Sequence, residues 1–184
     1  MLNAADKKKV LQITTDLENE SIRFLRDLVR IPSVAVVGEE KQCQELVFRK
    51  LQEIGCKTDI WETKWEEIKG ALGKDGKRLY TPVESWTSDY VGFKNRPNVV
   101  GVLEGSGTGR SILLNGHVDV VPVGPLDKWT HDPWAATVED GRLYGRGSAD
   151  MKAGLAAAIL AIECIQKANV KLQGNVILES VVDE

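Results

Sequence analysis

The spacing of hydrophobic positions predicts two amphipathic helices at the start of the chain. From about Ala4 to Val29, apolar residues recur at intervals of three and four. Ile31-Pro32 ends this run, because the residue before a proline is disfavoured in a helical conformation. Glu39 to Ile54 repeats the helical spacing, and Gly55 stands where a helix commonly ends. A short β-strand is expected at Cys56 to Trp61.

The remainder of the readable pattern is a mixture of strands and one helix. β-forming runs occupy four stretches: Asn98 to Leu103, Ser111 to Leu114, Thr137 to Tyr144 and Asn175 to Val182. The third contains Asp140-Gly141, which is typical of a hairpin turn. The fourth is almost continuously apolar, as in strands buried on both faces. Met151 to Gln166 is alanine-rich and predicts a helix. This alternation predicts one layered α/β domain over residues 1–184, with helices around a mostly parallel or mixed sheet.

Two stretches carry no sustained period. Glu62 to Arg96 holds several tryptophans and tyrosines among glycines and charges. We interpret it as a long surface excursion rather than an aromatic binding platform. Glu104 to Gly109 is glycine-rich, but it connects two strands instead of opening a helix, and no lysine follows at the spacing of a phosphate loop. It is expected to be a turn.

Composition and charge narrow the class of protein. The chain has 24 Lys and Arg against 27 Asp and Glu, a net charge of −3, and no long basic run, which argues against a nucleic-acid partner. Cys43, Cys56 and Cys164 are scattered, as expected for reduced thiols in the cytoplasm. The N-terminus has no apolar core of a secretory signal, and Ala153 to Ile162 is too short to span a bilayer. A cytoplasmic protein without a membrane span is predicted.

A histidine and an aspartate follow one of the apolar strands. Leu113-Leu114 leads into Asn115-Gly116-His117-Val118-Asp119. Positions two apart in an extended chain face the same side, so His117 and Asp119 can act together. His117 could bind a metal through one ring nitrogen while Asp119 takes the other ring N–H. The alternative is a histidine that makes ordinary hydrogen bonds at a strand end.

Further carboxylates stand at the ends of other elements. Asp150 lies between a glycine-rich loop and the alanine-rich helix, where it could be merely an N-cap, although the flanking glycines suggest a backbone held close to something. Asp183-Glu184 follows the last apolar strand directly. A histidine and carboxylates at strand ends are a recurrent way to build a hydrolytic zinc site.

Several motifs together resemble one family. NGHVDVVPVG, KWTHDPW, DGRLYGRGSADMKAG and ESVVDE occur in this order. They resemble the M20 family of metallopeptidases and N-acyl amino acid deacylases, which includes acetylornithine deacetylase, succinyl-diaminopimelate desuccinylase and carboxypeptidase G. LVRIPSV near the N-terminus extends the resemblance over essentially the whole chain.

The resemblance implies roles for individual residues. His117 would be a ligand of one zinc ion, and Asp150 the carboxylate that bridges two, with Co²⁺ able to replace Zn²⁺. Asp119 would position His117, and Glu184 would be the general base. The peptide bond after Asp150 would be cis. His131 lies in a loop beside the site in this family but is not a ligand, so a structural role is expected for it.

The implied activity is hydrolysis of an amide bond in an N-acyl amino acid or a small peptide. The form SADMKAG favours deacylases of the acetylornithine deacetylase type. In the family, a second glutamate that binds metal follows the position of Glu184. A later acidic residue, a later histidine and a lid domain for homodimerisation also follow. We therefore expect these 184 residues to be the N-terminal part of the catalytic domain, inactive alone. The alternative is a metal-free, non-catalytic binding domain that keeps the fold.

Overall fold

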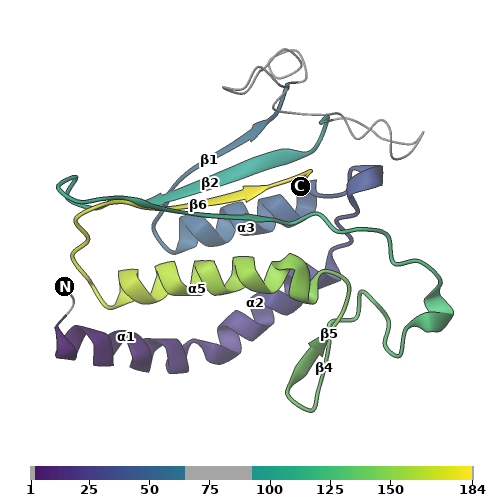
Figure 1. Ribbon diagram of the computed structural model, residues 1–184, viewed down its shortest axis with the longest axis horizontal. Coiled ribbons are helices and arrows are strands. Elements are labelled where there is room, and N and C mark those ends of the chain that lie inside the picture. Colours follow the sequence, from purple (N-terminus) through teal and green to yellow (C-terminus); the bar gives the residue numbers. More distant parts are fainter. Residues whose placement is uncertain (1–2, 65–92, 184) are drawn as a thin grey trace, which may run out of the picture.

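The computed structural model describes residues 3–64 and 93–183, which form a mixed sheet with helices packed against it (Figure 1). The sheet has the order β1-β2-β6-β3, with β1 at Lys57–Glu62, β2 at Pro97–Leu103, β6 at Val176–Val181 and β3 at Ile112–His117. β2 is antiparallel to β1 and to β6, whereas β3 is parallel to β6. The predicted α/β class with a mixed sheet is confirmed. Most of the aromatic stretch Glu62 to Arg96 lies outside the described residues.

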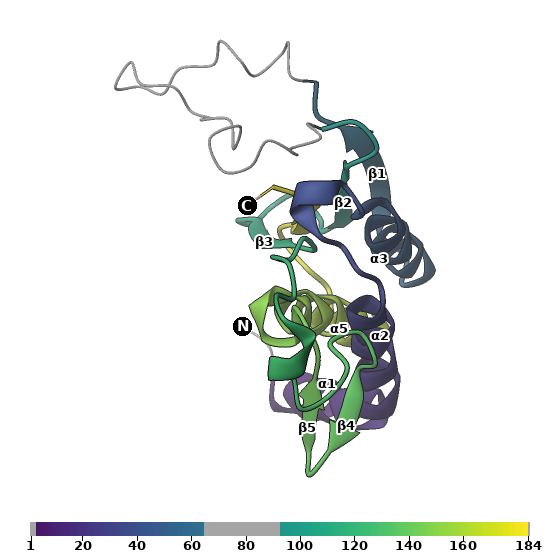
Figure 2. The same ribbon diagram turned by 90° about the vertical axis from the view of Figure 1, so that its right-hand side faces the viewer.

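The helices form a layer next to the sheet (Figures 1 and 2). The longer ones are α1 (Ala4–Asp16), α2 (Glu18–Arg30), α3 (Lys41–Glu53) and α5 (Ala153–Lys167), and the short helical segments are η1 (Ala35–Val37), η3 (Leu126–Lys128) and η4 (Ser148–Lys152). α3 packs on β1 and β2, and α5 packs on β3 and β6. α1 and α2 contact α5 in turn.

Glycines in two strands allow α3 and α5 to approach the same face of the sheet closely. A Cβ at Gly101 would lie 2.9 Å from a methyl group of Leu51 on α3, and one at Gly116 would lie 3.3 Å from Cγ of Leu155 on α5. Gly101 pairs with Leu178 across the sheet, and Gly116 is in register with Ser180, two residues further along β6. Because alternate residues face the same side, both helices cover one face.

The hydrophobic core lies between this face and the helices. It includes Leu28, Val47, Leu51, Val99, Leu155, Ile159, Ile162 and Leu178, all at most 1% exposed. β6 alternates between buried and half-buried residues rather than being buried on both sides. The prediction of a strand buried on both faces was therefore wrong for the described part of the chain, because α3 and α5 cover only one face of the sheet.

The predicted first helix is in fact two helices that meet at Leu17. The Asn3 side chain caps α1 by accepting a hydrogen bond from the backbone N–H of Asp6 at 2.8 Å. Leu17 has φ −92° and ψ −2°, which interrupts the helical path. Its side chain is only 9% exposed and lines a small hollow with Phe24 and Ile159. The bend thus lets both helices follow α5.

The hairpin prediction around Asp140-Gly141 is confirmed. β4 (Thr137–Glu139) pairs antiparallel with β5 (Arg142–Tyr144), and the two turn residues have φ values of 50° and 72°. Such positive values are easiest for glycine and tolerable for aspartate. The hairpin lies beyond the helices, away from the main sheet (Figure 2). The glycine-rich segment 104–109 connects β2 to β3 as a turn, also as predicted.

Within residues 3–64 and 93–183, no helix has both the length and the apolar character that crossing a membrane requires.

Candidate metal centre

His117 is the last residue of β3, at the end of the sheet next to the start of α5. Gly116 makes this approach possible, since a Cβ there would come within 3.0 Å of Cε of Met151. Residues 33–35 run beside the chain that follows β3. The Ser33 hydroxyl donates to the carbonyl oxygen of Val118 at 2.6 Å, and the Val120 N–H donates to the Ser33 carbonyl at 2.9 Å. Residues 33–35 thus hold the chain after His117 on one side, and β6 pairs with β3 on the other.

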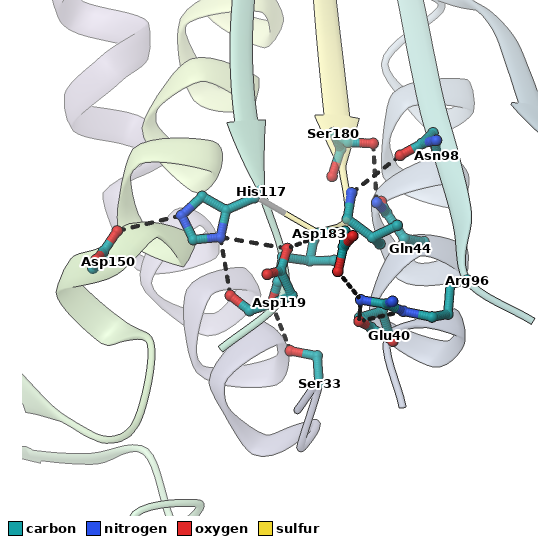
Figure 3. A network of polar contacts seen from close by, with 12 residues as sticks. Ser33, Glu40, Gln44, Arg96, Asn98, His117, Asp119, Asp150, Ser180 and Asp183 are labelled. Carbon is teal, nitrogen blue, oxygen red and sulfur yellow. Dashed lines mark hydrogen bonds and ion pairs between the residues drawn. The ribbon is translucent and has the colours of Figure 1, made fainter. Parts of the chain in front are cut away.

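The two ring nitrogens of His117 have different neighbours (Figure 3). Nδ1 lies 3.0 Å from the backbone carbonyl oxygen of Asp119, and Nε2 lies 3.3 Å from Oδ1 of Asp150. A carbonyl oxygen only accepts, so Nδ1 carries a proton and donates it. In the neutral imidazole, Nε2 is then an acceptor that faces a second acceptor, the Asp150 carboxylate. Two acceptors at this distance are stabilised by a cation or a proton between them.

Asp150 does not serve as a helix cap. α5 begins after Lys152 and no side chain caps it, while Asp150 itself has non-helical backbone angles of φ −125° and ψ 101°. The Asp150–Met151 peptide bond is cis, which confirms the prediction from the resemblance. The Asp150 side chain is 87% exposed and is directed at His117 (Figure 3). The capping alternative is therefore wrong, and the carboxylate is available to a ligand.

Lys152 anchors the segment that carries Asp150. Its side chain is fully buried, and Nζ donates to the carbonyl oxygens of Leu28 and Ile31, both at 2.9 Å. Burial lowers the pKa of Lys152, and these carbonyls at the end of α2 solvate its ammonium group instead of water. This contact places the segment before α5 firmly against α2.

Asp119 contacts His117 mainly through its backbone. Its Oδ1 lies 3.6 Å from Nδ1 of His117, farther than its carbonyl oxygen at 3.0 Å. The same carboxylate oxygen accepts a hydrogen bond from the backbone N–H of Asp183 at 3.1 Å. Asp119 is thus the link between His117 and the chain after β6. Glu184, the predicted general base, lies outside the described residues.

A buried polar cluster next to Asp183 was not foreseen from the sequence. The Arg96 guanidinium donates to Oε1 of Glu40 and to Oδ1 of Asp183. Burial raises the pKa of the Glu40 carboxyl, and the hydrogen bonds from Arg96 oppose this rise. Asn98 accepts from the backbone N–H of Val182 at 3.0 Å. In the sequence, Arg96, Asn98 and Asp183 lie in or beside apolar strands, whereas Glu40 precedes a helix and gave no signal.

His131 lies with the β4–β5 hairpin. Its ring centroid is 4.3 Å from that of Tyr144, and its Nε2 is 3.5 Å from Oε2 of Glu139. Nearby, the Trp129 indole N–H donates to the Val123 carbonyl at 2.9 Å. These contacts agree with the structural role predicted for His131.

The donor set around His117 fits zinc in chemistry and spacing. A tetrahedral zinc ion with bonds of about 2.0–2.1 Å keeps neighbouring ligand atoms about 3.3 Å apart. His117 Nε2 and Asp150 Oδ1 are separated by 3.3 Å. In the part of the chain that the structure describes, no group of three or more His, Cys, Asp or Glu side chains converges on such a point. Among the described residues, His117 and Asp150 are the pair whose spacing matches that of two zinc ligands.

Comparison with known proteins identifies the family. Residues 113–184, which contain His117, Asp119 and Asp150, match the family model described as peptidase family M20/M25/M40. These residues belong to the M20 family. This match starts within β3 and contains His117, Asp119, Asp150 and Asp183, whereas Ser33, Glu40 and Arg96 lie before it.

Similar proteins include a deformylase and a desuccinylase. It is 31% identical over 170 residues to N-formyl-4-amino-5-aminomethyl-2-methylpyrimidine deformylase of Halalkalibacterium halodurans, covering 91% of this chain and 33% of that protein. It is 45% identical over 177 residues to succinyl-diaminopimelate desuccinylase of Cupriavidus necator, covering 89% of this chain and 36% of that protein. The chain thus spans about a third of the length of the curated relatives it matches.

A solved structure supports the fold. Human carnosine dipeptidase 1 superimposes with a TM-score of 0.72 at 24% identity, over 97% of this chain and 35% of that chain. At this level of identity, the similarity establishes that the described residues have the fold of part of that protein.

Proposed function

We propose that the protein is a metal-dependent hydrolase that cleaves an amide bond in an N-acyl amino acid, a related N-acyl amine or a small peptide. One observation carries the proposal: His117 Nε2 faces Asp150 Oδ1 at 3.3 Å, with the Nδ1 proton already used by the Asp119 carbonyl. A cation satisfies both acceptors at once. Membership of the M20 family supports zinc as that cation, with Co²⁺ as a substitute.

His117 and Asp150 would hold the metal in this proposal, with Asp150 shared between two ions in a complete site. Zinc, when bound, supplies Lewis acidity that polarises the scissile carbonyl and makes water a better nucleophile at neutral pH. The Nδ1 hydrogen bond keeps the His117 ring in one orientation and directs Nε2 outward. Exposure of the Asp150 side chain leaves this edge open to substrate.

Glu184 is proposed as the general base that takes a proton from the attacking water and returns it to the leaving amine. Its neighbour Asp183 supports this role, because Asp183 is bonded to both Asp119 and Arg96.

Deacylation is favoured over cleavage of a dipeptide. Both relatives above with at least 31% identity are named for removing an acyl group, formyl in one and succinyl in the other. The dipeptidase similarity concerns the fold alone. The acyl group differs between those relatives, so the acetylornithine type predicted from SADMKAG is best tested by comparing N-acetyl, N-formyl and N-succinyl substrates on the full-length protein. A cytoplasmic location and a homodimer complete the proposal.

The direct test uses the two histidines. In the full-length protein, His117→Ala is expected to weaken zinc binding by more than about 100-fold, beyond the loss typical of residues that only support a ligand. It should abolish deacylation. His131→Ala is the matched control and should retain zinc, because His131 contacts Tyr144 and Glu139 instead. Equal loss of zinc in the two variants would contradict the assignment.

The 184-residue chain by itself is expected to bind zinc weakly and to show no turnover. Two ligand side chains converge in the described residues, whereas a catalytic zinc ordinarily has three. Zinc retention after dialysis and a deacylase assay with excess zinc would measure this. Stoichiometric zinc and turnover would contradict the expectation. A folded chain with neither would behave as the alternative, a non-catalytic domain.

A further inference from the structure

Glu40 and Arg96 form an ion pair with no exposure to solvent. Glu40 directly precedes α3, and Arg96 directly precedes β2. Arg96 Nε and Nη2 both donate to Oε1 of Glu40, at 2.9 and 2.6 Å, and both side chains are 0% exposed. Burying two charges removes their hydration, so such a pair is weak evidence for a contribution to stability. Its placement suggests a different role.

The pair holds the chain immediately after β6. Arg96 Nη2 also donates to Oδ1 of Asp183 at 3.1 Å (Figure 3). Asp183 has φ 67°, a left-handed conformation that is uncommon for residues other than glycine. Its backbone N–H donates to Oδ1 of Asp119 at 3.1 Å. Asp183 is therefore fixed from both sides in a conformation that it would rarely adopt alone.

The contacts continue from Asp183 to the candidate metal ligands. Asp119 receives the Asp183 hydrogen bond on its carboxylate, and its carbonyl oxygen accepts from His117 Nδ1. His117 in turn presents Nε2 to Asp150. We propose that Arg96, held by Glu40, is a positioning residue that orients His117 through Asp183 and Asp119. The test of this inference by zinc affinity rests on the proposed function.

The geometry explains why an arginine is suited to this place. One guanidinium group makes hydrogen bonds to two carboxylates that lie on different segments, Glu40 before α3 and Asp183 after β6. Arginine presents several donors in a fixed plane and keeps its charge when buried, whereas lysine offers one mobile ammonium group. Glu40 offsets the buried charge and fixes the direction of the guanidinium plane.

Two variants separate positioning from simple stability. Arg96→Met with Glu40→Gln removes the fully buried Arg96–Glu40 ion pair as a unit, and Asp183 loses the donor that Arg96 supplies. Glu40→Gln alone keeps Arg96, because the amide oxygen can still accept from the guanidinium. Lys50→Met with Glu163→Gln is the matched control, since it removes another largely buried ion pair, 2.8 Å long, between α3 and α5.

The first readout is the zinc dissociation constant of the full-length protein, measured by competition with a chelator. The double variant at Arg96 and Glu40 is expected to bind zinc about 10–100-fold more weakly, the range for loss of a group that supports a ligand. Glu40→Gln and the Lys50/Glu163 control should remain within about threefold of the wild type. Wild-type affinity in the Arg96/Glu40 double variant would overturn the inference.

The second readout needs no metal. Ring-nitrogen NMR of His117, assigned by its loss in His117→Gln, should show a protonated Nδ1 in the wild type and in Glu40→Gln. In the Arg96/Glu40 double variant, the ring-nitrogen shifts should instead be those of a proton shared between Nδ1 and Nε2. An unchanged spectrum in that variant would also overturn the inference. If the wild type fails to bind zinc, the proposed function falls, and the ring-nitrogen spectra still decide the role of Arg96.

Discussion

At the scale of single residues, the feature that matters most is the pairing of two acceptors, His117 Nε2 and Asp150 Oδ1, at 3.3 Å. His117 is 8% exposed and Asp150 is 87% exposed, so the imidazole is fixed and the carboxylate can adjust. A metal ion can bind both acceptors at once, whereas a single proton is carried either by the imidazole or by the carboxyl group. The substitution that best distinguishes a bound metal ion from a bound proton changes the Asp150 carboxylate alone.

Asp150→Asn is that substitution. The amide can donate to Nε2 and removes the contact between two acceptors, so the metal-free protein should change in stability by less than about 0.5 kcal/mol, as for an exposed position. The zinc affinity of the full-length protein should fall sharply because an amide is a much poorer zinc ligand than a carboxylate. Urea unfolding and chelator competition measure the two quantities. An unchanged zinc affinity would exclude Asp150 as a ligand.

Cys56 gives a prediction that depends on pH. Burial raises the pKa of its thiol from 9.0 to about 11. Since the thiolate is the reactive form, its fraction at pH 8 is about 100-fold below that of an ordinary cysteine. Alkylation of Cys56 by iodoacetamide in the folded protein should therefore keep accelerating about tenfold per pH unit above pH 9. A rate that levels off near pH 9 would contradict the effect of burial.

At the scale of elements, the close approach of β3 to η4 and α5 creates the candidate centre. Gly116 lies directly beside Met151, and Lys152 ties η4 to the end of α2. The positions of His117 and Asp150 are thus consequences of packing between β3, η4 and α2. A change in this packing should move the two side chains apart without altering either of them.

Gly116→Ala tests this dependence. Its Cβ would lie 3.0 Å from Cε of Met151 and 3.3 Å from Cγ of Leu155, so these side chains must give way by a few tenths of an ångström within the packed contact. We expect a loss of about 1–3 kcal/mol in unfolding free energy, as for other overpacked cores, together with weaker zinc binding. Gly101→Ala, which meets Leu51 at 2.9 Å under α3, is the control and should lose stability but keep zinc affinity. Equal zinc affinity in both variants would contradict the packing argument.

Local sequence patterns were sufficient to predict most helices and strands and part of the candidate metal centre. The strand before His117 and the hairpin at Asp140-Gly141 follow from local patterns. The bend at Leu17 could not be foreseen, because no glycine or proline marks it and it depends on packing against α5. Arg96, Glu40 and Asp183 are separated by 56 and 87 residues, so only the fold brings them together.

At the scale of the whole molecule, the described residues leave apolar surface on the sheet. Ile112 and Leu113 on β3 are 54% and 52% exposed, and β3 is the last strand in the order β1-β2-β6-β3. Leu113 is in register with Ile177, on the opposite face of the sheet from Leu178 and the helices. An exposed apolar strand at the edge of a sheet favours pairing with other chains.

The 184-residue chain should therefore associate with itself at high concentration. Leu113→Lys is expected to reduce this association, because a charge on an edge strand opposes pairing. Leu11→Lys on α1 is the control, since Leu11 is 68% exposed but lies on a helix. Sedimentation velocity over a range of concentrations measures the effect. A concentration-independent monomer in the unchanged chain, or equal effects of the two lysines, would contradict this expectation.

The proposed function requires His117 and Asp150 to share a metal ion. The most direct measurement is anomalous scattering at the zinc absorption edge from crystals of the full-length protein grown with zinc. We predict a peak about 2.0–2.2 Å from both His117 Nε2 and an Asp150 carboxylate oxygen, the range of zinc bonds to nitrogen and oxygen. Ordered zinc elsewhere, with this position empty at saturating zinc, would contradict the claim.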